Sequence, residues 1–343
     1  MKPHMTAPTP APAASVATMA DTAQAQLLLL DIHQVGALLQ RDDVLRAVRE
    51  AFTLHSQNAG RVFPVVREAL TSGGVFGIKS GDVAAQGLLG FKAAGFWPDN
   101  RARGSEPHQA TVMLIDPATG RPLCVLDGNA ITTARTGAAG AIGLQQLARP
   151  DSTRLCVFGT GVQAQVQLRY ALQALPALRS VRYAARSGQR DLAFEAHFAS
   201  QCDLSLATDG NAAVAGSDVV ITATPGAGPL FDAAAVQPGT HLNAVGADTR
   251  GKRELPEGLL ARARLFVDDA AQARAIGEAQ WAPTQPCTPL GDLLTGQAHA
   301  GRQESDITVF DMTGLALQDL TVARMLYAQA TAQGAGTRIA WPW

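Results

Sequence analysis

One short segment constrains the fold more than any other, because an apolar run leads directly into closely spaced glycines. The run Leu155–Phe158 is followed by Gly-Thr-Gly-Val-Gln-Ala and then by helix-forming residues. A strand, a G-x-G-x-x-A turn and a helix in this order are typical of a dinucleotide-binding unit. The first glycine permits the tight turn, the second lets a pyrophosphate approach the backbone, and the helix start supplies free N–H groups. The residues predicted to contact the dinucleotide here are Gly159, Gly161, Val162 and Gln163.

The end of the next predicted strand, Val181–Ala184, indicates which dinucleotide is bound. Folds that bind NAD usually place Asp or Glu there, about 20 residues after the glycines, to bind the ribose hydroxyls. This chain has Ala185 at that point, followed by Arg186, Ser187 and Arg190. Guanidinium and hydroxyl groups suit a 2′-phosphate. We therefore predict NADPH, held by Arg186 and Ser187, with NADH as the alternative if these arginines are only solvated residues at a helix start.

Length and strand pattern predict two domains. A chain of 343 residues exceeds what one hydrophobic core usually organises, and apolar residues, at 47%, suffice for two cores. Beyond Pro150, short apolar strands alternate with helical stretches, which favours a doubly wound parallel sheet. We expect a Rossmann-type α/β domain over residues 132–311 and an α+β domain formed by residues 25–131 and 312–343. The strands expected in the Rossmann domain are residues 155–158, 181–184, 219–223, 242–245 and 265–267.

The α+β domain is predicted from apolar spacing and turn residues. Two amphipathic helices are expected after Asp31, then strands at 62–69, 75–79 and 88–94, a hairpin at 111–126 and an Ala-rich helix at 132–147. The segment 307–310 and a helix at 320–330 follow the last strand assigned to the Rossmann domain, so we expect the chain end to return to the first domain. Residues 1–24 are rich in Ala, Pro and Thr, which predicts a disordered tail.

Composition argues against several classes of partner. The net charge is −1 and the 28 Lys and Arg residues are scattered, so nucleic acid is not an expected partner. No apolar run approaches the roughly 20 residues that cross a bilayer, and no basic start leads into a signal-type apolar segment, which favours the cytoplasm. Neither the cysteines nor the histidines show metal-ligand spacing, so no metal is expected.

Four polar residues stand out in apolar surroundings and form the candidate substrate site. They are Arg67, Lys92, Arg135 and Asp248. Three cations and one carboxylate suit an anionic substrate and one proton transfer. Each residue alone also fits a structural role, as a surface charge, a lysine at a strand end or a turn residue.

Five separate segments, in the same order along the chain, resemble the ornithine cyclodeaminase and mu-crystallin family. The likeness runs from about residue 60 to about residue 328. It implies a homodimer, with the α+β domain serving for substrate binding and dimerisation. The segments are Pro-His-Gln-Ala-Thr-Val at 107–112, Leu-Asp-Gly-Asn-Ala-Ile-Thr-Thr-Ala-Arg-Thr at 126–136, Val-Phe-Gly-Thr-Gly-Val-Gln-Ala at 157–164, Pro-Gly-Thr-His-Leu-Asn-Ala-Val-Gly-Ala-Asp at 238–248 and Val-Phe-Asp-Met-Thr-Gly-Leu-Ala at 309–316.

The resemblance assigns roles by position. It implies that Arg67, Lys92 and Arg135 hold the substrate carboxylate and that Asp248 is a general acid/base. Lys92 is the second catalytic candidate. It also implies several further cofactor contacts, of which Lys252 and Thr224 are second-rank candidates. These contacts are Arg135, Asn243, Ala244, Val245, Thr313, Lys252 and Thr224.

Three departures from the family pattern bear on the reaction. Pro107 stands where Thr or Ser often contacts the cofactor, Met312 where cyclodeaminases have Ser, and Ala185 where their NAD-binding Asp lies. A reductase must exchange its NADPH, and the absence of the NAD-binding Asp suits NADPH. We therefore expect reduction of a small cyclic ketimine, Δ1-pyrroline-2-carboxylate, to L-proline. The alternatives are an ornithine or related cyclodeaminase with bound NAD, and a non-catalytic NADPH-dependent binding protein, against which the presence of Asp248 argues.

Overall fold

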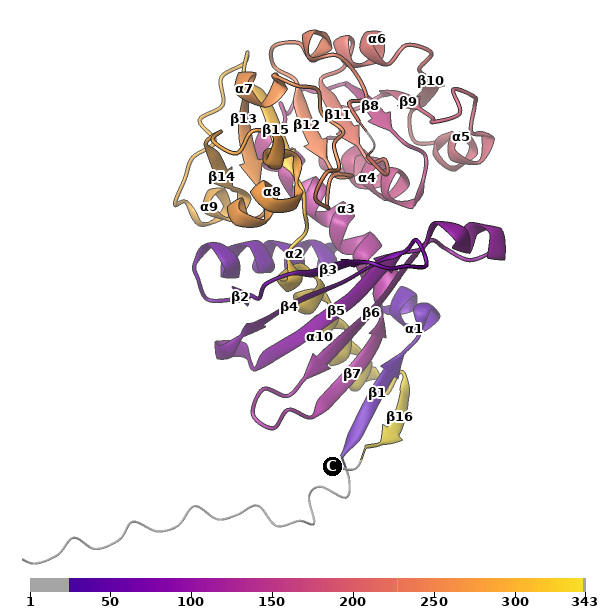
Figure 1. The fold of residues 1–343 in the computed structure, drawn as a ribbon, viewed down its shortest axis with the longest axis vertical. Coiled ribbons are helices and arrows are strands. Elements are labelled where there is room, and N and C mark those ends of the chain that lie inside the picture. The colour runs from indigo at the N-terminus through magenta and orange to yellow at the C-terminus, as the bar shows by residue number, and fades with distance from the viewer. Residues whose placement is uncertain (1–24, 227, 342–343) are drawn as a thin grey trace, which may run out of the picture.

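Two eight-stranded sheets, one above the other in Figure 1, organise the chain. The computed structural model describes residues 25–226 and 228–341, so the predicted tail at 1–24 lies outside the described residues. The architecture is a Rossmann-type parallel sheet joined to an α+β unit, as the sequence predicted. Within the described part of the chain, no helix has the length and hydropathy that crossing a membrane requires.

The first sheet is mixed, with the order β16-β1-β7-β6-β5-β4-β2 and β3 paired to β4. Only β1 and β7 run parallel, and all other neighbours are antiparallel. The predicted strand at 62–69 is interrupted, because Pro64 lies in the break between β2 and β3. The strands are β1 (Gln26–Leu30), β2 (Arg61–Val62), β3 (Val66–Ala69), β4 (Val75–Val83), β5 (Leu88–Phe96), β6 (His108–Ile115), β7 (Pro122–Asp127) and β16 (Thr337–Ala340).

Four helices pack in and around this first unit (Figure 1): α1 (Ile32–Leu38), α2 (Arg41–Ser56), α3 (Gly128–Leu147) and α10 (Ala316–Gln333). In α2 the buried side chains recur at helical spacing, as Val44, Val48 and Phe52 show. The predicted helix at 132–147 begins earlier, because Asp127 accepts the N–H of Ala130 and caps it. The predicted boundary between residues 131 and 132 therefore falls inside α3.

The second sheet is parallel throughout, with the order β10-β9-β8-β11-β12-β15-β13-β14. Its strands are β8 (Arg154–Phe158), β9 (Ser180–Ala184), β10 (Asp203–Leu206), β11 (Val219–Thr222), β12 (His241–Ala244), β13 (Ala263–Val267), β14 (Cys287–Pro289) and β15 (Ile307–Asp311). Its helices are α4 (Val162–Ala174), α5 (Leu192–Phe198), α6 (Gly210–Ala215), α7 (Leu259–Arg262), α8 (Ala270–Ile276) and α9 (Leu290–Thr295). Helix α3 packs against both α2 and α4 and so joins the two units.

One expectation about the chain end is only partly correct, because residues 307–310 do lie in the predicted Rossmann domain, 132–311, but not after its last strand. The segment at 307–310 was expected to follow the last strand of the parallel sheet, but as β15 it lies inside that sheet, between β12 and β13. All five of its residues are buried, which is typical of a central parallel strand covered on both faces. Directly after β15 the chain crosses to the first unit, where α10 packs on α2, β4 and β5 as predicted.

Candidate active site

The turn after β8 has the geometry that a diphosphate requires. Gly159 has φ +106°, and a Cβ there would lie 2.7 Å from the carbonyl oxygen of Ala223, so only glycine fits. Around Gly161 a Cβ would meet nothing within 4 Å, which leaves open space next to the start of α4. No side chain caps that helix start, and Oε1 of Gln163 is buried without a partner. Free N–H groups at a helix start and an open approach fit the phosphates of a dinucleotide.

The two arginines after β9 that were considered for binding a 2′-phosphate differ in their contacts. Arg190 forms an ion pair with Glu195, which also accepts the hydroxyl of Tyr183 at 2.5 Å. Arg186 is exposed and has no hydrogen bond or ion pair among the described residues. Ser187 accepts only a local backbone N–H. Arg186 is therefore the arginine that remains available to an incoming ligand.

Asp248 follows β12, at the edge of the parallel sheet where its strands end. Nη2 of Arg67 donates to its backbone oxygen at 3.0 Å and to Oδ2 at 3.1 Å, and Nζ of Lys252 donates to Oδ1 at 2.7 Å. Burial by surrounding atoms opposes ionisation, but the charges of Lys252 and Arg67 outweigh it and hold the pKa of Asp248 well below its usual range. About 40% of the side chain is exposed. Asp248 is therefore a carboxylate at neutral pH, open to a ligand.

Two of the predicted cofactor contacts have side chains that are occupied elsewhere. Oδ1 of Asn243 pairs with His241 at 2.9 Å, and its Nδ2 donates to the carbonyl of Gly140 at 3.1 Å, so this side chain joins β12 to α3. The hydroxyl and backbone N–H of Thr224 both donate to Oε1 of Glu254, at 2.6 and 2.7 Å. At these two positions the polar groups of the side chains are therefore already engaged within the protein. Ala244 and Val245, between Asn243 and the turn that leads to Asp248, are buried.

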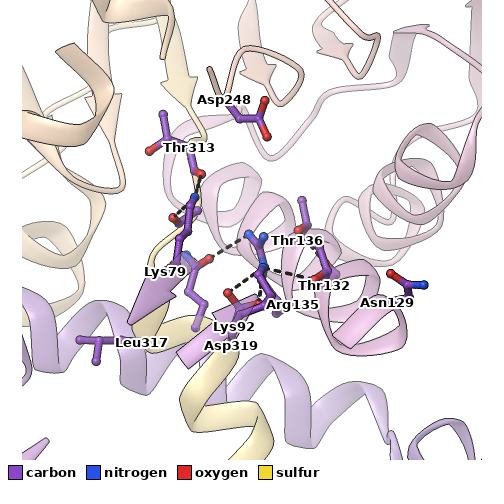
Figure 2. A network of polar contacts seen from close by, with 12 residues as sticks. Lys79, Lys92, Asn129, Thr132, Arg135, Thr136, Asp248, Thr313, Leu317 and Asp319 are labelled. Atoms are coloured by element: carbon purple, nitrogen blue, oxygen red, sulfur yellow. Dashed lines mark hydrogen bonds and ion pairs between the residues drawn. The ribbon is translucent and has the colours of Figure 1, made fainter. Parts of the chain in front are cut away.

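Lys92 and Arg135 converge on Asp319 in the second cluster of the site (Figure 2). Nζ of Lys92 lies 2.8 Å from Oδ2 of Asp319 and donates to the hydroxyl of Thr132 at 3.2 Å. Nε of Arg135 donates to Oδ1 at 3.1 Å, and its Nη1 donates to Oε1 of Gln318 at 3.2 Å. All five residues are buried. Asp319 lies in the first turn of α10, where the helix dipole favours a carboxylate.

Burial and the neighbouring charges act in opposite directions on the pKa values in this cluster. Burial and the charge of Arg135 lower the pKa of Lys92 to about 7, although Asp319 opposes the shift. Burial also works against ionisation of Asp319, but Lys92 and Arg135 together lower its pKa. The cluster thus offers two cations close to one carboxylate, and one of those cations titrates near neutral pH. Such a group suits both anion binding and proton exchange.

The predicted three-cation clamp is divided in the structure. Lys92 and Arg135 meet at Asp319, whereas Arg67 lies against Asp248 and the hydroxyl of Thr249. Asp319 was missed by sequence reasoning. Its signal was a lone carboxylate at a buried position of the apolar helix α10.

The crossing from β15 to α10 carries Thr313, another predicted cofactor contact. Its hydroxyl donates to Oδ1 of Asp268 at 2.6 Å and accepts from Nε2 of Gln272 at 2.7 Å. The N–H of Gly314 also donates to Asp268. From the first sheet, Nζ of Lys79 donates to the carbonyls of Thr313 at 2.6 Å and Gly314 at 2.8 Å. Lys79 and Asp268 were not predicted, although Lys79 stands out as a charge in an apolar strand.

The parallel sheet, its glycine turn and the charged groups at its carboxyl edge define an NAD(P)-dependent oxidoreductase. The model of the ornithine cyclodeaminase/mu-crystallin family matches residues 26–334. The chain belongs to that family, and the resemblance of the five segments is confirmed. Among known relatives, the iminosuccinate reductase of Paracoccus denitrificans is 33% identical over 331 residues, which cover 91% of this chain and 99% of that protein.

Solved structures agree with the fold over nearly the whole chain. An archaeal alanine dehydrogenase dimer with bound NAD has a TM-score of 0.86 at 31% identity, covering 92% of this chain and 99% of that one. The Δ1-pyrroline-2-carboxylate reductase of Thermococcus litoralis, in complex with NADH and L-proline, has a TM-score of 0.85 at 25% identity, covering 91% and 100%.

Proposed function

We propose that this chain uses NAD(P)H to reduce the C=N bond of a small imino acid to the corresponding amino acid. One observation carries the proposal. Asp248, at the end of β12, lies beyond Arg135 and Lys92 in Figure 2, and Lys79 interacts electrostatically with both Asp248 and Arg135; the Gly159 turn lies at the same edge of the parallel sheet. Ligands of open α/β sheets bind at this edge. The similarity to an iminosuccinate reductase and a pyrroline-2-carboxylate reductase supports the same chemistry.

Each residue has a role that follows from its charge. Lys92 and Arg135 bind the substrate carboxylate through charge-assisted hydrogen bonds. The ionised Asp248 stabilises the protonated imine nitrogen, and protonation makes the imine carbon more electrophilic. When bound, NAD(P)H supplies the hydride that adds to this carbon. Because the pKa of Asp248 is low, we assign it to stabilising the iminium electrostatically rather than to transferring the proton.

Within this class, we propose a cyclic imino acid, Δ1-pyrroline-2-carboxylate giving L-proline, as the ring-form substrate. We propose NADPH as the preferred cofactor, because Arg186 has no hydrogen bond or ion pair among the described residues and Ala185 offers no carboxylate to a ribose hydroxyl. We also propose that the protein is a homodimer in the cytoplasm. The archaeal alanine dehydrogenase, which is a dimer, supports that assembly.

The test is a cofactor-oxidation screen with the purified full chain. Δ1-Pyrroline-2-carboxylate and the imines formed from pyruvate or oxaloacetate with ammonium are each offered with NADPH and with NADH. The expected result is imine-dependent oxidation of the cofactor with formation of the amino acid. Release of ammonia from ornithine without net cofactor use would instead indicate a cyclodeaminase. Cofactor binding with no turnover of any of these compounds would indicate a binding protein.

A further inference from the structure

Lys79 is a half-buried cation that the proposed reaction leaves without a role. It lies on β4 directly opposite Lys92 on β5, so the two side chains project from the same face of the first sheet. Figure 2 shows Lys79 extending to the same side as Arg135, with Asp248 beyond both. Its electrostatic neighbours include Arg135, Arg67, Asp248 and Asp268, which place it between the two clusters of the site.

The contacts of Lys79 with the described residues do not neutralise its charge. Nζ donates to two backbone carbonyls, at Thr313 and Gly314, and forms no ion pair among the described residues. An ammonium group has three N–H donors, so one remains for a ligand. Both Asp248 and Asp319 already have two cationic partners each. Asp268 is the third carboxylate nearby, and burial raises its pKa, which weakens it as a compensating charge.

When Lys79 and Lys92 are protonated, the surrounding charges have a positive excess. The cations are Arg67, Lys79, Lys92, Arg135 and Lys252, and the carboxylates are Asp248, Asp268 and Asp319. A buried charge is unfavourable unless it is paired. A neutral group could donate hydrogen bonds to the two carbonyls equally well. Holding the connection between β15 and α10 in place at Thr313 therefore does not require a lysine. A ligand with more than one negative charge supplies what the protein lacks.

We propose that Lys79 forms a second anion subsite, so that the preferred substrate is an imino acid that carries two carboxylates. The first carboxylate binds Lys92 and Arg135, and the second binds Lys79. This inference rests on the proposed imine reduction, and it ranks a dicarboxylic imino acid above Δ1-pyrroline-2-carboxylate. The reaction is unchanged: the imine carbon gains a hydride from NAD(P)H and the nitrogen carries the added proton.

The experiment compares two imines that differ by one carboxylate. Oxaloacetate with ammonium gives iminosuccinate, and pyruvate with ammonium gives iminopropionate. Their kcat/KM values are measured for wild type, Lys79→Gln and Lys79→Met. The Gln variant removes the charge but keeps N–H donors for the carbonyls of Thr313 and Gly314, whereas Met removes both. Arg61→Gln is the matched control, because Arg61 is a cation of the same sheet that pairs with Asp82 away from the site.

Wild type should prefer iminosuccinate, and both Lys79 variants should lose about 10- to 100-fold of that preference, the range for a charge-assisted hydrogen bond. With Lys79→Gln, kcat/KM for iminosuccinate should fall about 10-fold or more beyond any loss for iminopropionate, and Arg61→Gln should change neither substrate. An equal loss of kcat/KM with both imines, or an unchanged ratio of the two kcat/KM values, would show that Lys79 only holds the connection between β15 and α10 in place. In that case the proposed reductase function would stand, whereas a wild type inactive with every imine would overturn both proposals.

Discussion

Replacing Asp248 with Asn tests the role of the carboxylate at the end of β12. The substitution keeps the size of the side chain and removes one negative charge from between Arg67 and Lys252. In the proposed mechanism that charge stabilises the protonated imine, an interaction that the neutral amide cannot replace. Turnover should therefore fall while the cofactor site, at the Gly159 turn, stays intact.

The expected size of the effect follows from the exposure of Asp248. Two unit charges about 4 Å apart interact by about 4 kcal/mol at an effective dielectric constant of about 20. The side chain keeps 40% of its surface exposed, so solvent and salt screen part of this energy. We expect a loss of about 3 kcal/mol of transition-state stabilisation, which is about 10²-fold in kcat/KM. The folding stability should change by only about 1 kcal/mol, because partly exposed ion pairs contribute little.

The assay measures imine reduction, NADPH affinity and the thermal midpoint on the same preparation of Asp248→Asn. Asp82→Asn is the matched control. Asp82 lies on β4, outside the site, and is also paired with an arginine, Arg61. We expect the control to keep its turnover and Asp248→Asn to keep its NADPH affinity. Turnover of Asp248→Asn within a few-fold of wild type would refute the catalytic role of this carboxylate.

The remaining predictions concern the cofactor and the first carboxylate. Arg186→Ala should lower kcat/KM for NADPH about 10- to 100-fold more than for NADH, since it removes a charged donor; equal losses would exclude Arg186. Gly161→Val should abolish dinucleotide binding, measured by titration, with an unchanged thermal midpoint. Lys92→Ala and Arg135→Ala should each lower kcat/KM by about 10²-fold or more; wild-type kcat/KM values in both folded variants would place the substrate elsewhere. In the wild type, kcat/KM should fall as the pH rises through about 7, where Lys92 loses its proton.

Features that depend on local sequence were predictable. The Gly159 turn requires glycine because of its own backbone angle and the neighbouring carbonyl, so the motif indicates the geometry directly. Lys92, Arg135 and Asp248 were found because charged residues in apolar segments are unfavourable without a purpose. Each does lie in the charged network, although Arg67 faces Asp248 rather than the other two cations.

Features that depend on which elements meet were not predictable from one sequence. Local periodicity identified the strand at 307–310 but not its place in the sheet, because the order of parallel strands is set by crossovers. Asp319 and Lys79 gain their significance only where α10, β4 and β5 come together. Asn243 was a predicted cofactor contact, but in the fold its side-chain amide donates to the carbonyl of Gly140 on α3.

The most direct test of imine reduction follows the hydride itself. The full chain is incubated with NADPH that carries deuterium at C4 of the nicotinamide, and with the best imine from the screen, and the amino acid is analysed by mass spectrometry and NMR. The account predicts one deuterium at the α-carbon, transferred from a single face of the cofactor, with one NADPH consumed per amino acid formed. An amino acid formed without deuterium at the α-carbon, or cofactor oxidation without any amino acid, would contradict it.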